Sequence, residues 1–311
     1  MNTLHQRPEP LNRYALAFFC FWGLALLVTV GFRAENPAYR EQLERWHQKR
    51  IESLKSESGW LNLAGLFWLQ PGANPAGSDP NNLLMFPAGK APDQLGTFRL
   101  RGDTVTFTAA PGVVVQDEDR QPVLGEKPLF VPDQKPGPVL SHGPLRWFVI
   151  KRGNRYAIRL RDLESPFLSD FKGIDRYPVD EHNQIKARLE RPETPRTIPI
   201  LDVTGQVSQQ PLVGTLVFRM AGKTHRLDAV SEGPDKLFIL FGDQTNRHET
   251  YGSGRFLYAD IPGPDGLTTL DFNQSINPPC AFTPYATCPL PPKQNQLALA
   301  VRAGEKRYGD H

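Results

Sequence analysis

The chain has 311 residues, 39% of them hydrophobic, and can therefore bury a sizeable core as one large or two modest domains. Its 36 basic and 33 acidic residues leave a formal net charge of +3 without a basic stripe or arm, so we expect no nucleic-acid partner. Thirty prolines and 26 glycines favour a turn-rich β architecture over a helical one.

An uncharged apolar segment, Tyr14–Phe32, follows a short tail of residues 1–13. Its length falls within the roughly 17–25 residues that cross a bilayer as a helix. A cleaved signal peptide usually has a shorter apolar core and small residues before the cut, whereas here Phe32 precedes a cut after Ala34. The sequence predicts a retained transmembrane anchor at 14–32, and the alternatives are a cleaved signal peptide and a buried core helix.

The short tail before this segment is typical of a signal anchor, although the basic residues on its two sides give no clear charge bias. We therefore expect a single-pass protein of the cell membrane, attached through Tyr14–Phe32, with its body in the periplasm or outside the cell. Cys280 and Cys288 are the two cysteines after the segment, an even pair that agrees with an oxidising compartment.

An amphipathic helix is predicted over residues 36–58. Asn36 is a suitable N-cap and Pro37 a suitable first helical residue, and Gly59 is a suitable terminator. Side chains that could pack on the body recur at helical spacing: Tyr39, Leu43, Trp46, Arg50 and Leu54.

The remaining body, residues 59–311, has the short alternating segments of β-strands. The run 60–69 predicts a strand, and 70–78 a turn-rich connection. Hairpins are predicted for 97–101 with 104–108, 145–150 with 156–161, and 213–219 with 224–227, and further strands for 237–241, 256–258 and 297–301. The expected fold is mainly β, with antiparallel sheets arranged as a sandwich or a partly open barrel, and the loop-like composition of 162–189 marks a candidate subdivision.

The segment Asn277–Cys288 combines prolines, two aromatic residues and two cysteines. Proline fixes φ and removes a backbone donor, so this segment is predicted to be a rigid, extended loop. Cys280 and Cys288 could form a disulfide, act as metal ligands or supply a nucleophile. In an exported domain a disulfide is the simplest interpretation, and we expect one.

Polar and charged side chains follow the predicted strand 237–241 in a glycine-punctuated segment. His248 and Glu249 are the catalytic candidates, as acid or base. Arg161 and Arg255 could grip a carboxylate or phosphate, or could instead be buried ion pairs with Asp162, Asp260 or Asp271. The expected ligand-binding residues are Arg161, Tyr251, Arg255, Asp260, Asp271, Asn273, Asn277 and Tyr285. We expect Arg255, Glu249 and Asp271 to converge, with Tyr285 as a wall.

No HExxH or CxxC spacing supports a metal site, and no P-loop, GxSxG or dinucleotide fingerprint is present. We therefore expect neither a metal nor a cofactor.

Several stretches together are similar to those of a known family: 59–69, 159–162, 249–258, 271–273 and 277–292. On these residues the chain resembles the bacterial domain of unknown function 1684 family. The resemblance spans nearly the whole body and implies a shared fold and a shared site near the polar residues. It carries no catalytic residue that could be transferred.

Two functions remain open from the sequence. The first is a pocket that binds, and could hydrolyse, a small anionic or sugar-like ligand of the cell envelope. The second is a non-enzymatic envelope module whose polar residues form a structural network. An open pocket lined by these side chains would favour the first, and a sealed, mutually paired cluster the second.

Overall fold

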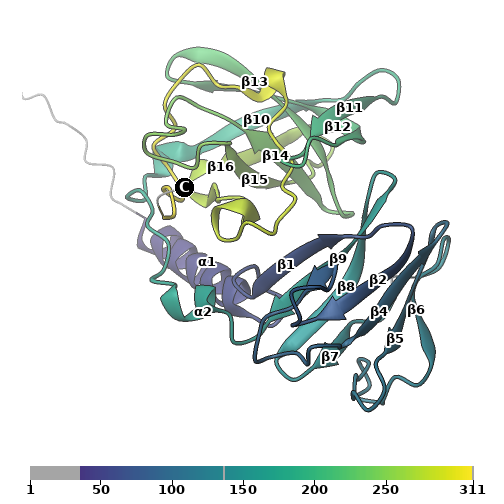
Figure 1. Cartoon of the computed structure of the whole chain (residues 1–311). Helices are drawn as coiled ribbons and strands as arrows, with labels where there is room; N and C mark the ends of the chain where they lie inside the picture. Colours follow the sequence, from purple (N-terminus) through teal and green to yellow (C-terminus); the bar gives the residue numbers. More distant parts are fainter. Residues whose placement is uncertain (1–35, 136, 310–311) are drawn as a thin grey trace, which may run out of the picture. The chain divides into compact units, whose positions relative to one another are not determined.

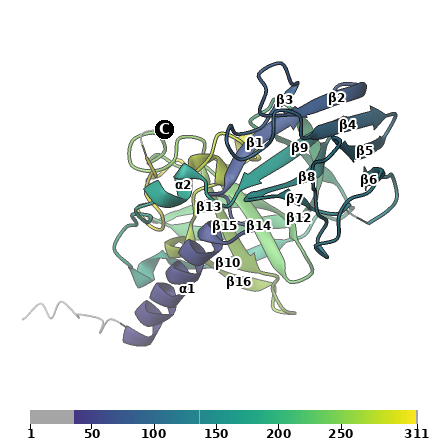
Figure 2. The ribbon, with the colours of Figure 1, turned by 60° about the horizontal axis from the view of Figure 1, so that its bottom comes forward.

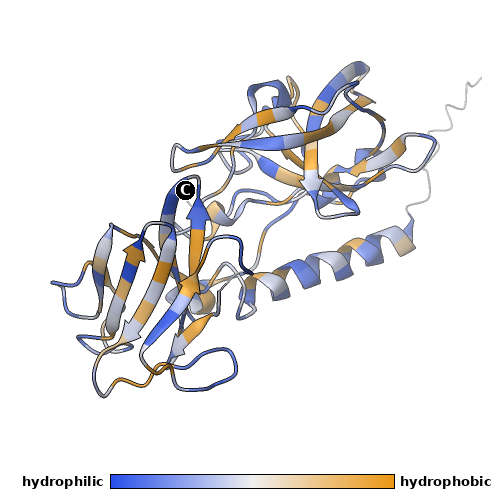
Figure 3. Ribbon diagram, turned by 90° about the vertical axis from the view of Figure 1, so that its right-hand side faces the viewer, coloured by the Kyte–Doolittle hydropathy of each residue, from blue (hydrophilic) through white to orange (hydrophobic). Residues whose placement is uncertain are grey.

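The helix α1 (Pro37–Lys55) begins the described part of this computed structural model, which comprises residues 36–135 and 137–309 (Figure 1). Asn36 caps it as predicted, because its side chain accepts a hydrogen bond from the Tyr39 backbone amide at 3.3 Å. Hydrophilic residues cover most of α1 in Figure 3, while Tyr39, Leu43 and Leu54 are buried. The helix ends three residues earlier than predicted, in a turn where a Cβ on Gly59 would lie 2.1 Å from the Leu54 carbonyl oxygen.

No helix in residues 36–135 and 137–309 has both the length and the apolar character to span a membrane. The predicted anchor Tyr14–Phe32 lies outside the described residues. From Asn36 onward the chain forms one compact unit. The proposed subdivision at 162–189 coincides with the passage from one group of sheets to another, and it stays a prediction.

Two sheets build the first half of this unit. One has the order β1-β9-β8-β7, from β1 (Leu63–Trp68), β7 (Leu140–His142), β8 (Leu145–Arg152) and β9 (Arg155–Asp162). The other has the order β3-β2-β4-β5-β6, from β2 (Gly72–Gly77), β3 (Leu84–Met85), β4 (Gly96–Arg101), β5 (Thr104–Ala109) and β6 (Glu126–Phe130). The pairings are antiparallel apart from β2 with β3.

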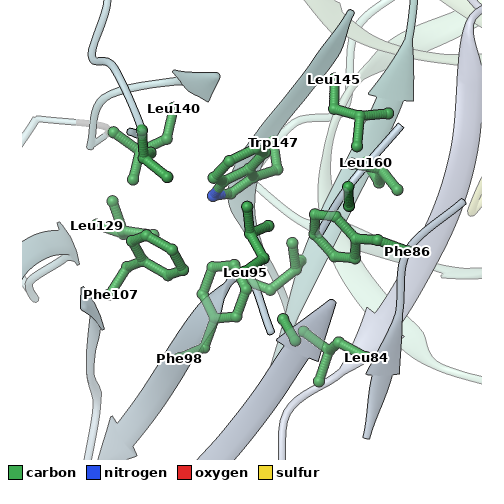
Figure 4. Packing of buried hydrophobic residues seen from close by; sticks show 14 of the residues in the cluster. Leu84, Phe86, Leu95, Phe98, Phe107, Leu129, Leu140, Leu145, Trp147 and Leu160 are labelled. Atoms are coloured by element: carbon green, nitrogen blue, oxygen red, sulfur yellow. The ribbon is translucent and has the colours of Figure 1, made fainter. Parts of the chain in front are cut away.

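Apolar side chains from both sheets meet in one core, which makes this half a β-sandwich. Trp147 of β8 is fully buried, with its ring 5.6 Å from Phe86 and 5.7 Å from Phe107 (Figure 4). Leu160 of β9 joins them from the same sheet as Trp147. The odd-numbered residues of β9 consequently face away from the sandwich.

The second half is a nearly closed barrel with the strand order β15-β14-β13-β12-β10-β16. Its strands are β10 (Gln184–Glu190), β12 (Val207–Met220), β13 (Lys223–Glu232), β14 (Lys236–Phe241), β15 (Arg255–Asp260) and β16 (Leu267–Asp271), and β11 (Thr197–Leu201) pairs with β12. The two ends of this order approach each other, where Thr268 Oγ1 donates to the Asp260 carbonyl at 2.8 Å. In Figure 2, α1 lies beside β10 and β16, and Tyr39 Oη donates to Asp271 at 2.9 Å.

The mainly β, antiparallel prediction is confirmed, and the three predicted hairpins are present as β4–β5, β8–β9 and β12–β13. Two local predictions are wrong. The supposed turn at 70–78 contains β2, in which Pro75 lies opposite Thr97. The supposed strand 297–301 is irregular, because Leu297 N bonds to Gly242 O and Leu299 O accepts from Gln244 N without a continuous ladder.

The segment 162–189, expected to be a loop, also contains regular elements. They are the short helix α2 (Pro166–Asp170), the 3-10 turn η1 (Glu181–Asn183) and most of β10. The remaining 3-10 turns are η2 (Phe272–Gln274), η3 (Pro279–Ala281) and η4 (Lys293–Asn295).

Candidate functional site

A pocket of about 230 Å³ lies where α1, the sandwich, the barrel and the loop after β16 meet. Arg50 enters its wall from α1, Arg152 from β8 and Arg159 from β9. Phe238 of β14, Phe256 and Tyr258 of β15, Trp60 and the segment 286–289 complete most of the lining. The pocket thus collects three arginines and four aromatic side chains from distant parts of the chain.

Strand β9 positions the central arginine through its alternation. Ile158 and Leu160 belong to the sandwich core, so Arg159 projects from the opposite face. Arg159 is nevertheless buried on that face, with only 5% of the residue exposed. The segment 286–289 supplies Thr287, whose Oγ1 lies 3.3 Å from Arg159 Nη2.

Arg159 lacks the partners that a buried cation normally has. Among residues 36–135 and 137–309, no carboxylate lies within ion-pair distance of it, and its Nε has no hydrogen-bond partner. Its guanidinium carbon lies 5.7 Å from the centre of the Trp60 ring. Burial, followed by repulsion from Arg152 and Arg161, lowers the pKa of Arg159 to about 10. A buried guanidinium without a counter-ion is costly, and an anion in the pocket would remove that cost.

Thr287 also orients a second guanidinium, because its Oγ1 accepts from Arg152 Nε at 3.1 Å. Arg152 Nη1 donates to the Lys151 carbonyl at 3.0 Å, and Arg152 has no carboxylate partner in the described part of the chain. Two positive groups therefore share one hydroxyl oxygen. This arrangement holds both arginine side chains toward one wall of the pocket.

Unlike Arg152 and Arg159, Arg50 has a carboxylate partner within the protein. Its Nε lies 3.2 Å from Glu305 Oε1 and its Nη2 donates to the Asn277 carbonyl at 3.0 Å. The Glu305 side chain is 1% exposed, and desolvation raises its pKa although Arg50 opposes the shift. Arg50 therefore contributes shape and donors to the pocket, while Arg152 and Arg159 carry its unbalanced charge.

Another part of the lining is aromatic. Phe238 stacks on Tyr258 with ring centres 5.1 Å apart, and it meets Phe256 edge-on at 4.9 Å. Glu232, an exposed carboxylate, adds a negative group to the lining. The pocket can thus accept a molecule with an anionic group at the arginines and a flat or apolar part at the aromatic wall.

Two residues from the predicted site line this pocket, Asn277 and Cys288. Asn277 Nδ2 donates to the Lys306 carbonyl at 2.8 Å, whereas its buried Oδ1 has no partner. The extended proline-rich loop was predicted, apart from the short η3 turn within it.

Arg255 is enclosed within the protein and paired with a buried carboxylate. Its side chain is 0% exposed, and its Nη2 lies 2.8 Å from Asp243 Oδ2. The same guanidinium donates to the carbonyls of Val301 and Ala303. The predicted choice of partners (Asp162, Asp260 or Asp271) is corrected to Asp243. The reason is the β14–β15 register, which places Phe241 opposite Arg255 and brings Asp243 to its guanidinium.

Arg255, Glu249 and Asp271, which were predicted to converge, each bond to different partners within the protein. Glu249 accepts hydrogen bonds from Arg302 Nη2 at 2.8 Å, from Arg302 Nε at 3.0 Å and from Tyr177 Oη at 2.9 Å. The hydrogen bond from Arg302, followed by the one from Tyr177, lowers the pKa of Glu249 and so favours its ionised form. His248 is exposed and is not among the residues that line the pocket around Arg159.

Asp271 and Asn273 belong to a network that fixes α1. Asn273 Nδ2 donates to Asp271 at 3.1 Å and to Tyr39 Oη at 2.9 Å. Asp260 is exposed and pairs with Lys236. These three predicted ligand residues are therefore occupied by contacts within the protein.

The remaining predicted residues lie elsewhere. Arg161 lines a second pocket and donates to the Gly59 carbonyl and to Asn62 Oδ1, the latter at 2.8 Å. Tyr251 packs against the cluster that contains Phe282, and burial raises its pKa to about 12. Tyr285 is half-buried and is not among the residues that line the candidate pocket.

Cys280 and Cys288, the two cysteines of the predicted disulfide, are both free thiols in this structure, and the Cys280 backbone amide donates to Cys288 Sγ at 3.0 Å. The disulfide stays a prediction. In residues 36–135 and 137–309 no group of three or more His, Cys, Asp or Glu side chains is placed to hold a metal ion.

The model of a family described as a protein of unknown function, DUF1684, matches residues 169–306. The chain belongs to the DUF1684 family. The matched region begins within α2 and includes the barrel and the loop with Thr287, whereas Arg152 and Arg159 precede it.

Among solved structures, an uncharacterized protein from Haloarcula marismortui, studied by solution NMR, is similar to this DUF1684 chain. The two are 30% identical with a TM-score of 0.38, and the match covers 46% of this chain and 80% of that one. No curated protein matches the chain.

Sequence reasoning missed Arg50, Arg152 and Arg159. The available signal was the alternation of β9, which combines an apolar face with a face bearing Arg159 and Arg161. That pattern normally indicates a solvent-exposed face. Here Thr287, which lies 128 positions further along the chain, contacts Arg159 on this face.

Proposed function

We propose that this protein binds a small organic anion in the pocket around Arg159. The anionic group, a carboxylate or phosphate, occupies the space beside Arg152 and Arg159, and an apolar or aromatic part lies against Phe238 and Tyr258. The observation that carries the proposal is the buried Arg159 guanidinium, which has an unpartnered Nε and no counter-ion in the described residues.

His248 and Glu249, the acid–base candidates, lie outside this pocket. The cluster around Arg255 is sealed and paired, which supports a structural role for that part of the predicted site. We further propose that Tyr14–Phe32 anchors the chain in the membrane and that the body acts in the cell envelope. The support for this is the uncharged length of the segment.

Calorimetric titration of the full chain in detergent with phenyl phosphate tests the binding proposal, because this probe combines an anion with a flat ring. The variant Arg159→Met keeps much of the apolar part of the side chain and removes the guanidinium with its N–H donors. We expect the affinity to fall by about tenfold to a hundredfold, since hydrogen bonds to charged groups contribute roughly 1.5–3 kcal/mol. Inorganic phosphate should bind more weakly than phenyl phosphate, because it lacks the ring.

Arg155→Met is the matched control. Arg155 lies on the same strand and face, is exposed, and has its guanidinium carbon 4.0 Å from the Trp68 ring, outside the pocket. Its replacement should leave the affinity unchanged. The proposal is refuted if the wild-type protein gives no binding heat, or if Arg159→Met binds as the wild type does. A large loss of melting temperature in Arg159→Met would assign Arg159 to the fold instead.

A further inference from the structure

The two free thiols lie at the edge of the anion pocket. Cys288 lines the pocket directly after Thr287, the residue that orients both unpaired arginines. The η3 turn folds the chain back so that the Cys280 amide reaches Cys288 Sγ at 3.0 Å. The sulfur atoms of two residues eight positions apart are thereby brought together inside one loop.

The two thiols are not equivalent. Cys288 is 3% exposed, and burial followed by the neighbouring Cys280 raises its pKa. Cys280 is half-buried, and a hydrogen bond from the Cys288 thiol, with a further contribution from the charge of Arg159, lowers its pKa. Cys280 is therefore the group that ionises first and attacks, and Cys288 is the resolving thiol.

An ionised Cys280 competes with any ligand for the positive charge of Arg159. The sulfur atoms favour the charged form of Arg159, whereas Arg152 and Arg161 disfavour it. Removing the negative charge of the thiolate leaves the guanidinium free for an anion in the pocket. Oxidation of the pair would remove that charge without adding another.

We propose that Cys280 and Cys288 form a reversible disulfide that increases the affinity of the pocket for anions. This inference rests on the proposed binding function. The Cys280 thiolate attacks one sulfur of a low-molecular-weight disulfide, forming a mixed disulfide and releasing one thiolate. Cys288 then loses its proton, attacks Cys280 Sγ and releases the second thiolate. Both protein thiols are oxidised, and the small disulfide is reduced to two thiols.

The test is carried out on the full chain in detergent in a Cys20→Ser background, which leaves Cys280 and Cys288 as the two thiols of the protein. Oxidised glutathione is added, and alkylation followed by mass spectrometry counts the free thiols. We expect both thiols to be lost and a peptide linking Cys280 to Cys288 to appear, with dithiothreitol restoring them. Two thiols that remain free throughout overturn the proposal.

Titration with phenyl phosphate at a pH above 8 then compares the reduced and oxidised forms. The oxidised form should bind about tenfold more tightly, the scale of losing one competing charge a few ångströms away in a partly screened site. Cys280→Ser and Cys288→Ser should each bind equally under both conditions. Equal affinity of the two wild-type forms overturns the coupling.

The outcomes separate the two proposals. If phenyl phosphate does not bind either form, the binding function fails, while the thiol count still shows whether the disulfide forms. If Arg159→Met abolishes binding and the redox state does not alter it, the binding function stands and the redox control is refuted.

Discussion

Replacing Arg255 by methionine removes a guanidinium from an ion pair in which both side chains are 0% exposed. Asp243 would keep its hydrogen bonds from Thr245 N at 2.7 Å and Thr245 Oγ1 at 2.6 Å, but it would lose its positive partner. The carbonyl of Val301, 2.8 Å from Nη2, would lose a donor as well. Breaking a buried pair in this way leaves an uncompensated charge and costs about 3–5 kcal/mol.

For a unit running from Asn36 to His311, this loss corresponds to a decrease in melting temperature of roughly 5–10 °C. Urea denaturation and thermal melts of the full chain in detergent would measure it. The double variant Asp243→Asn/Arg255→Met should recover part of the loss, because no carboxylate is then left buried without a partner.

Arg302→Met is the matched control, because it removes an exposed arginine from its pair with Glu249 and should leave the midpoint nearly unchanged. An Arg255→Met protein that unfolds at the wild-type midpoint but binds phenyl phosphate less tightly would refute this reasoning.

Two further variants test the energetics of the fold. Burial raises the pKa of Glu305 above its ordinary 4.5, so the folded state holds this proton more tightly than the unfolded state does. The stability of the wild type relative to Glu305→Gln should therefore decrease as the pH rises from about 4.5 through the folded-state pKa of Glu305. Urea denaturation of both proteins from about pH 4 to about pH 7 measures this difference. Midpoints that differ by a constant amount over this range would contradict the prediction. Gly254 has φ +98°, and a Cβ there would lie 2.6 Å from the Phe241 carbonyl oxygen, so Gly254→Ala should destabilise by roughly 2 kcal/mol or more. Gly252→Ala, whose Cβ would meet only the flexible Arg247 side chain at 3.3 Å, should be tolerated better, and similar thermal melts for the two variants would count against the strain argument.

Short sequence patterns correctly predicted the elements whose formation depends on neighbouring residues alone. The β4–β5 hairpin follows from two alternating segments around Gly102, whose φ of +56° suits the residue without a Cβ. The N-cap of α1 follows from Asn36 and Pro37. These features need no information from distant parts of the chain.

The features that were missed depend on tertiary packing. The strand β2 was hidden by Pro75, which the sheet accommodates opposite Thr97. Asp243 could have been assigned to Arg255 from the register of the predicted strands 237–241 and 256–258, had they been paired as a hairpin. The covered position of Arg159 could not be predicted, because Thr287 reaches it from across the fold.

The contacts made by residues 301–305 have a consequence for folding during synthesis. Arg255 donates to the carbonyls of Val301 and Ala303, and Arg50 pairs with Glu305, 255 positions further along the chain. While the ribosome is still translating the preceding segment, Arg50 of α1 has no Glu305 to pair with. The sandwich strands have already emerged by then, so the sandwich can form first, whereas the contacts of Arg50 and Arg255 with residues 301–305 must wait until that last segment has been made.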